Sequence, residues 1–580
     1  MRTRKSNQGL AVQAIAGSNV VLLGINMDRD DCDGLTGFAI HRTDHDEDEA
    51  YWLRGMKTFE ETDPGFVPGS TYPTNKHPIQ GFTWSDFSAK PGHRYTYRIH
   101  ALRGTPKTLN PFKEVVIKVA AESEEGGKHD VFFNRGAAAS QEYVRRFGDR
   151  KPDKSNPKDK RLEWLSRGVI EAVEAFTERA SDSSWGLRVA AYEFRLDRFA
   201  DAIRRAHKRG ADVRILYDGC NHPPDKNGHV FPRDDNQSTA RKARIKSLCT
   251  DRVTRRDVKR PPISHHKFIV LLKNDKPEAV LTGSTNFSLG GVFGQSNLIH
   301  IVDDPDIASS YLKCWNLIAQ NPDHKALKSD LSAMNRIPTG RPEQGTISVF
   351  SPQKTKAALD WYAKLAMDAE GALFMTFAFG MNKVFLNVYE KGNARLRYAL
   401  LDKLLRPGIR KDKRTAEEKR IKQLRFMKEN RFAVGNRIAT NKFDRWVKET
   451  VSGLNTHVQF IHTKFMLIDP LGPEPVVITG SANFSDASTL NNDENMLVIR
   501  GNTRVADIYL GEYMRLWNHY AFREWAASKI NQPNLRFKFL DTKNIWWKEY
   551  FGDTDRSRQR LYFSGSESPS TFNPHWMEII

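Results

Sequence analysis

The sequence predicts an α/β protein of two related halves, preceded by an all-β domain. A strand–helix–strand pattern occurs twice, with an offset of 184 to 185 residues, and a set of polar residues recurs inside apolar segments with a constant offset of 197 residues. The first 120 or so residues instead contain short alternating segments separated by turn residues. These three observations define the expected organisation of the chain.

Residues 1–120 are expected to form a β-sandwich. The segment 95–101 alternates apolar and polar side chains and follows a Lys-Pro-Gly turn, and residues 37–42 show a related pattern. These stretches read Tyr-x-Tyr-x-Ile-x-Ala and Gly-Phe-x-Ile-x-Arg, and they resemble fibronectin type III or immunoglobulin-like domains. A polar linker at 122–127 ends this domain.

The strand–helix–strand pattern places the elements of the two halves. In the first half, a strand at 187–194 precedes a helix at 196–208 and a second strand at 213–218; the second half repeats the order with 373–379, 384–389 and 396–402. Strands that alternate with helices predict crossover connections and a mostly parallel sheet. We place the first half at 128–340, the second half at 341–545 and a C-terminal tail at 546–580.

Composition narrows the class of protein. Of the 580 residues, 39% are hydrophobic and 28% are charged, which is typical of a globular protein. The four cysteines lie far apart without a Cys-x-x-Cys pair, and no acids and histidines cluster at metal-ligand spacing, so we predict neither a metal nor a cofactor. No apolar segment approaches the roughly 20 residues of a membrane span and no signal peptide is visible. We therefore expect a cytoplasmic protein without integral membrane association.

The repeated polar residues carry the functional prediction. Each half contains a His-x-Lys segment followed by apolar residues, and later a Gly-Ser-x-Asn segment after another apolar strand. In an extended chain, residues i and i+2 face the same side, so the His and the Lys of each pair point together. The residue between them in the first half, His266, points to the opposite face and is interpreted as structural. The predicted site residues are His265, Lys267, Ser284 and Asn286 in the first half, and His462, Lys464, Ser481 and Asn483 in the second.

Such a set of side chains suits a phosphodiester. Lysine and asparagine side chains can neutralise and hold the non-bridging oxygens, as can the serine hydroxyls. One histidine can attack phosphorus as a nucleophile, while the other protonates the leaving oxygen.

The paired motifs resemble the HxK(x4)D…GSxN pattern of the phospholipase D superfamily, over about residues 130–540. The resemblance implies a bilobed fold of two pseudo-twofold α/β/α halves and a single active site that one chain can complete. It also implies a phosphohistidine intermediate formed without a metal. By analogy with relatives, His265 would be the nucleophile, and His462 would act first as the acid and then as the base for water, with Lys267 and Lys464 assisting.

The two copies of the motif differ at supporting positions. Asp469 completes the motif in the second half, whereas Leu272 stands there in the first. The acid expected after Gly-Ser-x-Asn is Glu494, which could orient a catalytic histidine through its second ring nitrogen. Aligning Asn297 with Asn495 would place Ser296 opposite Glu494.

The substrate class is not fixed by the motif. Two basic segments precede the two His-x-Lys motifs: residues 226–260 hold 11 Lys and Arg against 4 Asp and Glu, and residues 403–448 hold 16 against 5. Segments of this charge could bind a nucleic acid backbone, so we expect a nuclease whose partner is DNA before RNA. A phospholipase attracted to an anionic bilayer is the alternative. A third hypothesis is a non-catalytic nucleic-acid or membrane adaptor that retains the fold.

Overall fold

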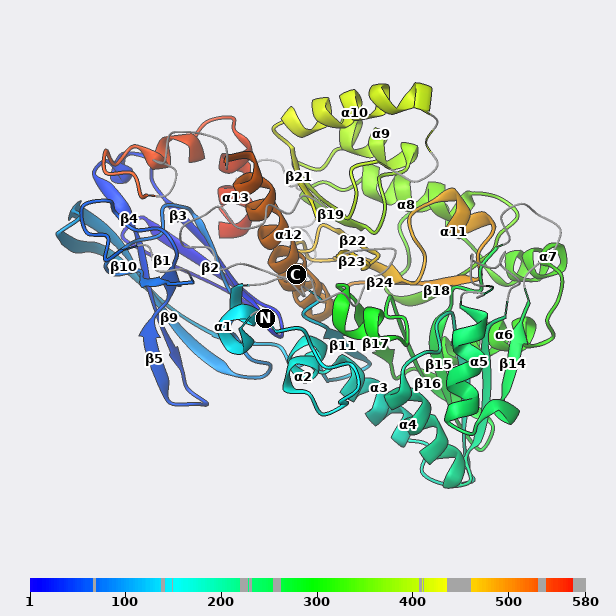
Figure 1. The fold of residues 1–580 in the computed structure, drawn as a ribbon. Helices are drawn as coiled ribbons and strands as arrows, with labels where there is room; N and C mark the ends of the chain where they lie inside the picture. Colours follow the sequence, from blue (N-terminus) through cyan, green and yellow to red (C-terminus); the bar gives the residue numbers. More distant parts are fainter. Residues whose placement is uncertain are drawn as a thin grey trace, which may run out of the picture.

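The computed structural model describes most of the chain (Figure 1). The description covers residues 1–566 except 66–68, 137–140, 149, 220–227, 229–231, 254–261, 406–408, 410, 436–459 and 530–538. Parts of both basic segments therefore lie outside the described residues.

The N-terminal region is a sandwich of two antiparallel four-stranded sheets, as the fold prediction requires. Side chains of both sheets pack into one apolar core that includes Leu23, Phe38, Tyr97 and Ile117. At the start of β9 the Tyr95 hydroxyl accepts the backbone N–H of Lys90 at 2.8 Å, a corner contact known from Greek-key sandwiches. The fibronectin type III resemblance stays a prediction. One sheet contains β1 (Arg2–Asn7), β2 (Leu10–Ala16), β3 (Val21–Met27) and β8 (Thr83–Asp86), and the other contains β10 (Thr108–Ala120), β9 (Arg94–Thr105), β4 (Leu35–Asp44) and β5 (Glu49–Trp52).

Two seven-stranded sheets follow, and their strand orders correspond one to one. The repeat found in the sequence is therefore a repeat of the whole sheet. The first sheet has the order β11 (His129–Phe133), β17 (Leu298–Val302), β16 (Lys276–Gly283), β15 (Lys267–Lys273), β12 (Trp185–Ala191), β13 (Asp212–Asp218) and β14 (Cys249–Arg252). The second has the order β18 (Gly345–Ser351), β24 (Glu494–Arg500), β23 (Val476–Gly480), β22 (Phe465–Ile468), β19 (Ala372–Phe377), β20 (Leu396–Leu401) and β21 (Asn430–Val434).

The expectation of mostly parallel sheets is wrong. In each sheet only the two strand pairs that follow the helical crossovers are parallel, and the other four pairs are antiparallel. A tight turn explains this in the first half: Asn274 and Asp275 both adopt positive φ, at 49° and 61°, and reverse the chain between β15 and β16. Asn and Asp tolerate this conformation, which two-residue hairpins favour. The Asn-Asp pair was the local signal for a hairpin.

Helices cover both faces of each sheet. In the first half, α3 and α4 lie over an outer core with Ile170 and Phe199, and in the second half α8 and α9 lie over a core with Leu359 and Phe385. The inner faces share one large core with α6 and α12, to which Tyr509 of α12 belongs. The helices are α1 (Gln141–Phe147), α2 (Lys160–Ser166), α3 (Val169–Glu178), α4 (Asp197–Lys208), α5 (Arg233–Lys242), α6 (Pro305–Ala319), α7 (His324–Met334), α8 (Ala357–Met367), α9 (Lys383–Lys391), α10 (Lys411–Phe426), α11 (Asp486–Leu490), α12 (Thr503–Lys529) and α13 (Asp555–Ser564).

The last described helix, α13 (Asp555–Ser564), returns to the sandwich (Figure 1). Trp547 joins the sandwich core, and Phe563 of α13 joins the core shared by the two halves. The backbone of Phe563 lies so close to Gly24 of β3 that a Cβ there would come within 2.1 Å of its carbonyl oxygen. The described part of the segment placed at 546–580 is thus packed against the sandwich. None of the helices in the described residues is long and apolar enough to span a bilayer.

Candidate active site

The two His-x-Lys motifs meet between the halves. The ring centroids of His265 and His462 lie 6.4 Å apart, and both rings line a cleft of about 710 Å³. Each histidine is 6% exposed, so most of each ring is enclosed by protein. The spacing leaves room for one phosphodiester between two imidazoles.

The chain enters each motif beside a segment of the opposite half. Ser264 pairs in parallel with Asp493, and the N–H of His265 donates to the Asp493 carbonyl at 2.9 Å. The mirrored pairing joins Ile461 to Ser296, and the N–H of His462 donates to the Ser296 carbonyl at 3.2 Å. Backbone hydrogen bonds between the halves therefore fix the relative position of the two rings.

The lysines lie directly beneath the histidines. Lys267 Nζ donates to the His265 carbonyl at 2.7 Å and Lys464 Nζ donates to the His462 carbonyl at 2.5 Å. Lys464 lines the cleft, and Lys267 is fully buried beside it. His266 points away, as the i, i+2 argument requires: its ring lies 3.2 Å from the Asn495 amide nitrogen and 3.9 Å from Cys314 Sγ.

The Gly-Ser-x-Asn segments supply different groups to the front and the back of the site. Asn286 and Asn483 line the cleft, and their buried Oδ1 atoms have no hydrogen-bond partner within the described part of the chain. The serines lie behind the histidines: Ser284 Oγ donates to Asn297 Oδ1 at 2.8 Å, and Ser481 Oγ accepts the Asn495 N–H at 3.0 Å. The expected contact of the serines with phosphate stays a prediction.

The glycines of these segments allow neighbouring strands to approach. A Cβ on Gly283 would lie 2.3 Å from the Leu298 carbonyl oxygen, and one on Gly480 would lie 2.2 Å from the Asn495 carbonyl oxygen. Any larger residue would push the Ser-x-Asn segment away from the strand that carries the next polar partners.

The side chains that contact the two histidines through Nδ1 are a carboxylate in one case and an amide in the other, and each belongs to the opposite half. Glu494 Oε2 lies 2.9 Å from His265 Nδ1, so a carboxylate of the second half orients the histidine of the first. Asn297 Oδ1 lies 3.0 Å from His462 Nδ1, and Asn297 Nδ2 donates to the Gly291 carbonyl, which fixes the orientation of the amide. Asn297 thus stands opposite Glu494, and the alignment that placed Ser296 there is wrong. The constant offset of 197 residues would have identified Asn297, because it links 297 to 494.

Asp469 supports the fold and does not face the cleft. Its carboxylate accepts the backbone N–H groups of Gly371 and Ala372 at 2.7 and 3.0 Å, which holds the start of β19. Leu272, its counterpart, is buried in the shared core.

Burial shifts the pKa values of the histidines, the lysines and Glu494 at the cleft. Burial lowers the pKa of His265 and of His462 well below the ordinary value, and the two lysines lower them further. Burial lowers the pKa of Lys267 to about 7 and that of Lys464 well below its ordinary value. Burial raises the pKa of Glu494 to about 7, although Lys267 opposes this shift. An anionic ligand between the rings would raise the pKa of His462 and of the lysines and so favour their protonated, positively charged forms.

Further residues of the first half line the cleft and were not predicted. The Tyr192 ring centroid lies 4.9 Å from that of His265. Glu193 forms an ion pair with Arg195, which is also bonded to Asp235 of α5 at 2.8 Å. Burial alone would raise the pKa of Glu193, but Arg195, Ser288 and Lys267 together outweigh burial and the pKa is lowered. The equivalent stretch of the second half supplies Phe377 and Ala378, so the two walls of the cleft differ in charge.

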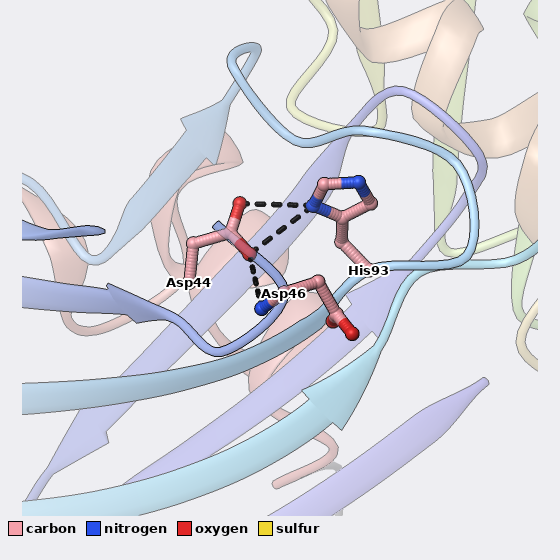
Figure 2. Close-up of side chains that lie close together, drawn as sticks. All are labelled: Asp44, Asp46 and His93. Carbon is pink, nitrogen blue, oxygen red and sulfur yellow. Dashed lines mark hydrogen bonds and ion pairs between the residues drawn. The ribbon is translucent and has the colours of Figure 1, made fainter. Parts of the chain in front are cut away.

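Among the described residues, one group of possible metal ligands lies in the sandwich. Figure 2 shows Asp44, Asp46 and His93, whose ligand atoms lie within 4.8 Å of one another. His93 Nδ1 lies 3.0 Å from the Asp44 carboxylate, and the Asp46 carboxylate pairs with Arg94 at 3.0 Å. These contacts explain the cluster without a metal, because they hold the end of β4 against the start of β9.

The family comparison matches both halves. A model described as the PLD-like domain of cardiolipin synthase matches residues 178–316 and 414–517. No curated protein matches the sequence.

Similar solved structures cover the chain in part. Phosphatidylserine synthase of Haemophilus influenzae is 11% identical, with 61% of this chain and 85% of that chain covered and a TM-score of 0.41. Yeast tyrosyl-DNA phosphodiesterase is 13% identical, with 57% and 87% covered and a TM-score of 0.31. Polyphosphate kinase of Porphyromonas gingivalis is 10% identical, with a TM-score of 0.37; 57% of this chain is covered, and it spans 43% of the length of that enzyme.

The matched segments contain the His-x-Lys motif and the Gly-Ser-x-Asn motif of their half, and the two sheets that carry them share one strand order. The chain is therefore similar to that family model in both of its halves.

Proposed function

We propose that this chain is a metal-independent phosphodiesterase in which His265 and His462 act on one scissile phosphodiester. The observation that supports this most strongly is the pair of facing imidazoles, 6.4 Å apart, each held through Nδ1 by a side chain of the opposite half. With Nδ1 occupied, Nε2 of each ring is the nitrogen left for chemistry.

In the first step, His265 Nε2 attacks phosphorus and the bond from phosphorus to the leaving oxygen breaks. His462 gives its Nε2 proton to that oxygen, so an alcohol leaves and a phosphohistidine remains. In the second step, His462 takes a proton from water, the hydroxide attacks phosphorus, and the P–N bond breaks. The second product is a phosphomonoester, and both histidines return to their starting states.

The unlike partners suit these unlike roles. Forming the P–N bond places positive charge on the His265 ring, which the Glu494 carboxylate stabilises across 2.9 Å. Asn297 Oδ1 can only accept, so it holds the proton of His462 on Nδ1 and leaves Nε2 to gain and lose a proton. The arrangement agrees with the assignment of His265 as nucleophile and His462 as acid and base.

Nucleic acid is the substrate class that we propose. The chain has a net charge of +20, and the described part of the second basic segment presents Lys411, Lys413 and Arg414 as exposed side chains on α10. In the described residues, the large exposed apolar side chains are scattered and none lines the cleft, whereas docking on a bilayer favours an apolar rim. We propose DNA before RNA, in the cytoplasm.

A phospholipid substrate is the second candidate, because the description of the matched family model names cardiolipin synthase. The two candidates share the site and the two-histidine chemistry. They differ in what binds outside the cleft.

One experiment tests the function and separates these candidates. The full-length protein is incubated in EDTA with plasmid DNA, single-stranded DNA, RNA, anionic phospholipid vesicles and bis(p-nitrophenyl) phosphate. We expect hydrolysis of the small diester and of a nucleic acid. Release of a phospholipid head group without cleavage of any nucleic acid would favour the second candidate. No hydrolysis of any diester would contradict the proposed function.

A further inference from the structure

A buried ion pair joins the two halves directly behind the Glu494–His265 contact. Arg252, the last residue of β14, is 1% exposed, and its Nε donates to Asp493 Oδ2 at 3.1 Å. Asp493 is fully buried and immediately precedes Glu494. Burying two charges is costly unless each is paired and hydrogen-bonded, so a pair at this place calls for an explanation.

Arg252 is itself held on its other side. Its Nη1 donates to Asn321 Oδ1 at 2.9 Å and to the Pro322 carbonyl at 3.0 Å, both just after α6. The guanidinium is therefore a rigid bridge between the end of α6 and the Asp493 carboxylate. Lysine could not bridge in this way, because it lacks the planar fork of donors.

The position of Asp493 in turn fixes the backbone of His265 and the place of Glu494. Its backbone carbonyl accepts the N–H of His265 at 2.9 Å, and its N–H donates to the Ile263 carbonyl at 3.0 Å. The next residue, Glu494, holds His265 Nδ1 at 2.9 Å. A shift of Asp493 would thus move the His265 backbone and the carboxylate that orients its ring.

At the equivalent described positions behind His462, the ion pair has no counterpart. The offset of 197 residues places Ser296 opposite Asp493. In the first sheet, the register of β13 with β14 places Arg252 opposite Asp218. Asp402 is the equivalent of Asp218 in the second half, and the register of β20 with β21 places Gly435 opposite Asp402. Gly435 is therefore the equivalent of Arg252. Glycine and serine cannot form an ion pair. The Arg252–Asp493 pair lies behind the carboxylate of Glu494, and no such pair lies at the equivalent positions behind the amide of Asn297. The ion pair and the histidine partners therefore show the same asymmetry.

We infer that Arg252 is a positioning residue for the nucleophilic side of the site, acting through Asp493 on the Glu494–His265 contact. The inference rests on the proposed function for its effect on catalysis, but the contact itself can be measured without any substrate.

The activity test compares Arg252→Met on two backgrounds, with bis(p-nitrophenyl) phosphate as substrate. In the wild type, we expect kcat to fall by about 100-fold with a smaller change in KM, since small misplacements of reacting groups have effects of this size. On a Glu494→Ala background, the same change should cause little further loss, because the side chain that Arg252 positions against His265 is then absent. Arg252→Lys should recover part of the loss. Equal losses on both backgrounds, or no loss in the wild type, would overturn the inference.

Arg42→Met is the matched control. Arg42 and Asp86 form a comparably buried pair in the sandwich at 3.3 Å, away from the cleft. Thermal unfolding of every variant shows whether it is folded at the assay temperature. We expect Arg42→Met to lower stability and leave kcat of the folded protein unchanged. If Arg252→Met does not fold, Arg252→Lys carries the same comparison on the two backgrounds, and equal losses there overturn the inference as well.

The substrate-free test uses NMR of protein with ¹⁵N-labelled histidine. The proton on His265 Nδ1 is assigned by its loss in His265→Ala. We expect its resonance to shift or broaden in Arg252→Met and to stay in place in Arg42→Met. An unchanged resonance in Arg252→Met would overturn the inference. If the wild type hydrolysed no diester, the proposed function would fail while this test still decided whether Arg252 positions the contact.

Discussion

Replacing Glu494 by Gln should stabilise the unliganded protein at alkaline pH while it impairs catalysis. Burial raises the pKa of this carboxyl from an ordinary value of 4.5 to about 7. At about 1.4 kcal/mol for each pKa unit, this rise corresponds to about 3 to 4 kcal/mol for holding Glu494 ionised in the folded state. Gln removes that charge and can still accept from His265 Nδ1, as Asn297 accepts from His462.

The sign of the effect depends on pH. Because the folded-state pKa lies above the ordinary value, the folded protein binds this proton more tightly than the unfolded chain. The free-energy cost of ionising the buried Glu494 in the folded protein is therefore absent below about pH 4.5 and fully present above about pH 7. Lys267 loses a favourable partner in the variant, which reduces the gain. We expect Glu494→Gln to be more stable than the wild type by about 1 to 3 kcal/mol at pH 8 and of nearly equal stability at pH 4.5.

Denaturant unfolding of the full-length wild type and variant at pH 4.5, 6 and 8 measures this difference. The activity of Glu494→Gln on a small diester should fall by about 10² to 10⁴-fold, in the range seen when the carboxylate that orients a catalytic histidine is replaced by an amide. The mirrored variant, Asn297→Asp, adds a buried carboxylate opposite His462 and should be less stable at pH 8. A Glu494→Gln protein that is destabilised equally at every pH, or that keeps full activity, would refute the reasoning.

Three further predictions test the site and the substrate. Hydrolysis of a small diester should persist in EDTA, since histidine and lysine side chains supply the nucleophile, the acid and the charge; strict dependence on Mg²⁺ would contradict this. His265→Ala and His462→Ala should each abolish turnover, with the double variant no worse than either one, whereas half activity in each would indicate two independent sites. Replacing Lys411, Lys413 and Arg414 of α10 by Gln should weaken DNA binding and make its salt dependence shallower, by up to about one unit for each phosphate that is no longer neutralised, while turnover of the small diester stays unchanged. An unchanged salt slope would show that α10 does not touch the DNA backbone.

The sequence was sufficient for the repeat and for the convergence of the motifs. The constant offset between His265 and His462 reflects two sheets of one strand order, and the i, i+2 argument correctly separated Lys267 from His266. These features follow from local geometry, which the amino-acid pattern specifies directly.

Features that depend on long-range pairing were missed. The antiparallel strand pairs were hidden because alternating strands and helices were interpreted as crossovers throughout, and the Asn274-Asp275 turn was not used. Asn297 was aligned with Asn495 because both are asparagines, and this alignment concealed its position opposite Glu494. Arg252 lies 241 residues from Asp493 in the sequence, so nothing local indicates that they meet. The packing of Phe563 on the sandwich is invisible for the same reason.

The most direct test of the account is to identify the covalent intermediate. The His462→Ala variant, which lacks the base for the water step, is incubated in EDTA with bis(p-nitrophenyl) phosphate, quenched at alkaline pH and digested for mass spectrometry. Since p-nitrophenolate needs little help from an acid to leave, we expect the intermediate to form and to accumulate as an acid-labile phosphoryl adduct on His265. We expect no adduct in His265→Ala. Turnover in the wild type combined with no adduct on His265 in His462→Ala, or an adduct on any residue other than His265, would contradict the account.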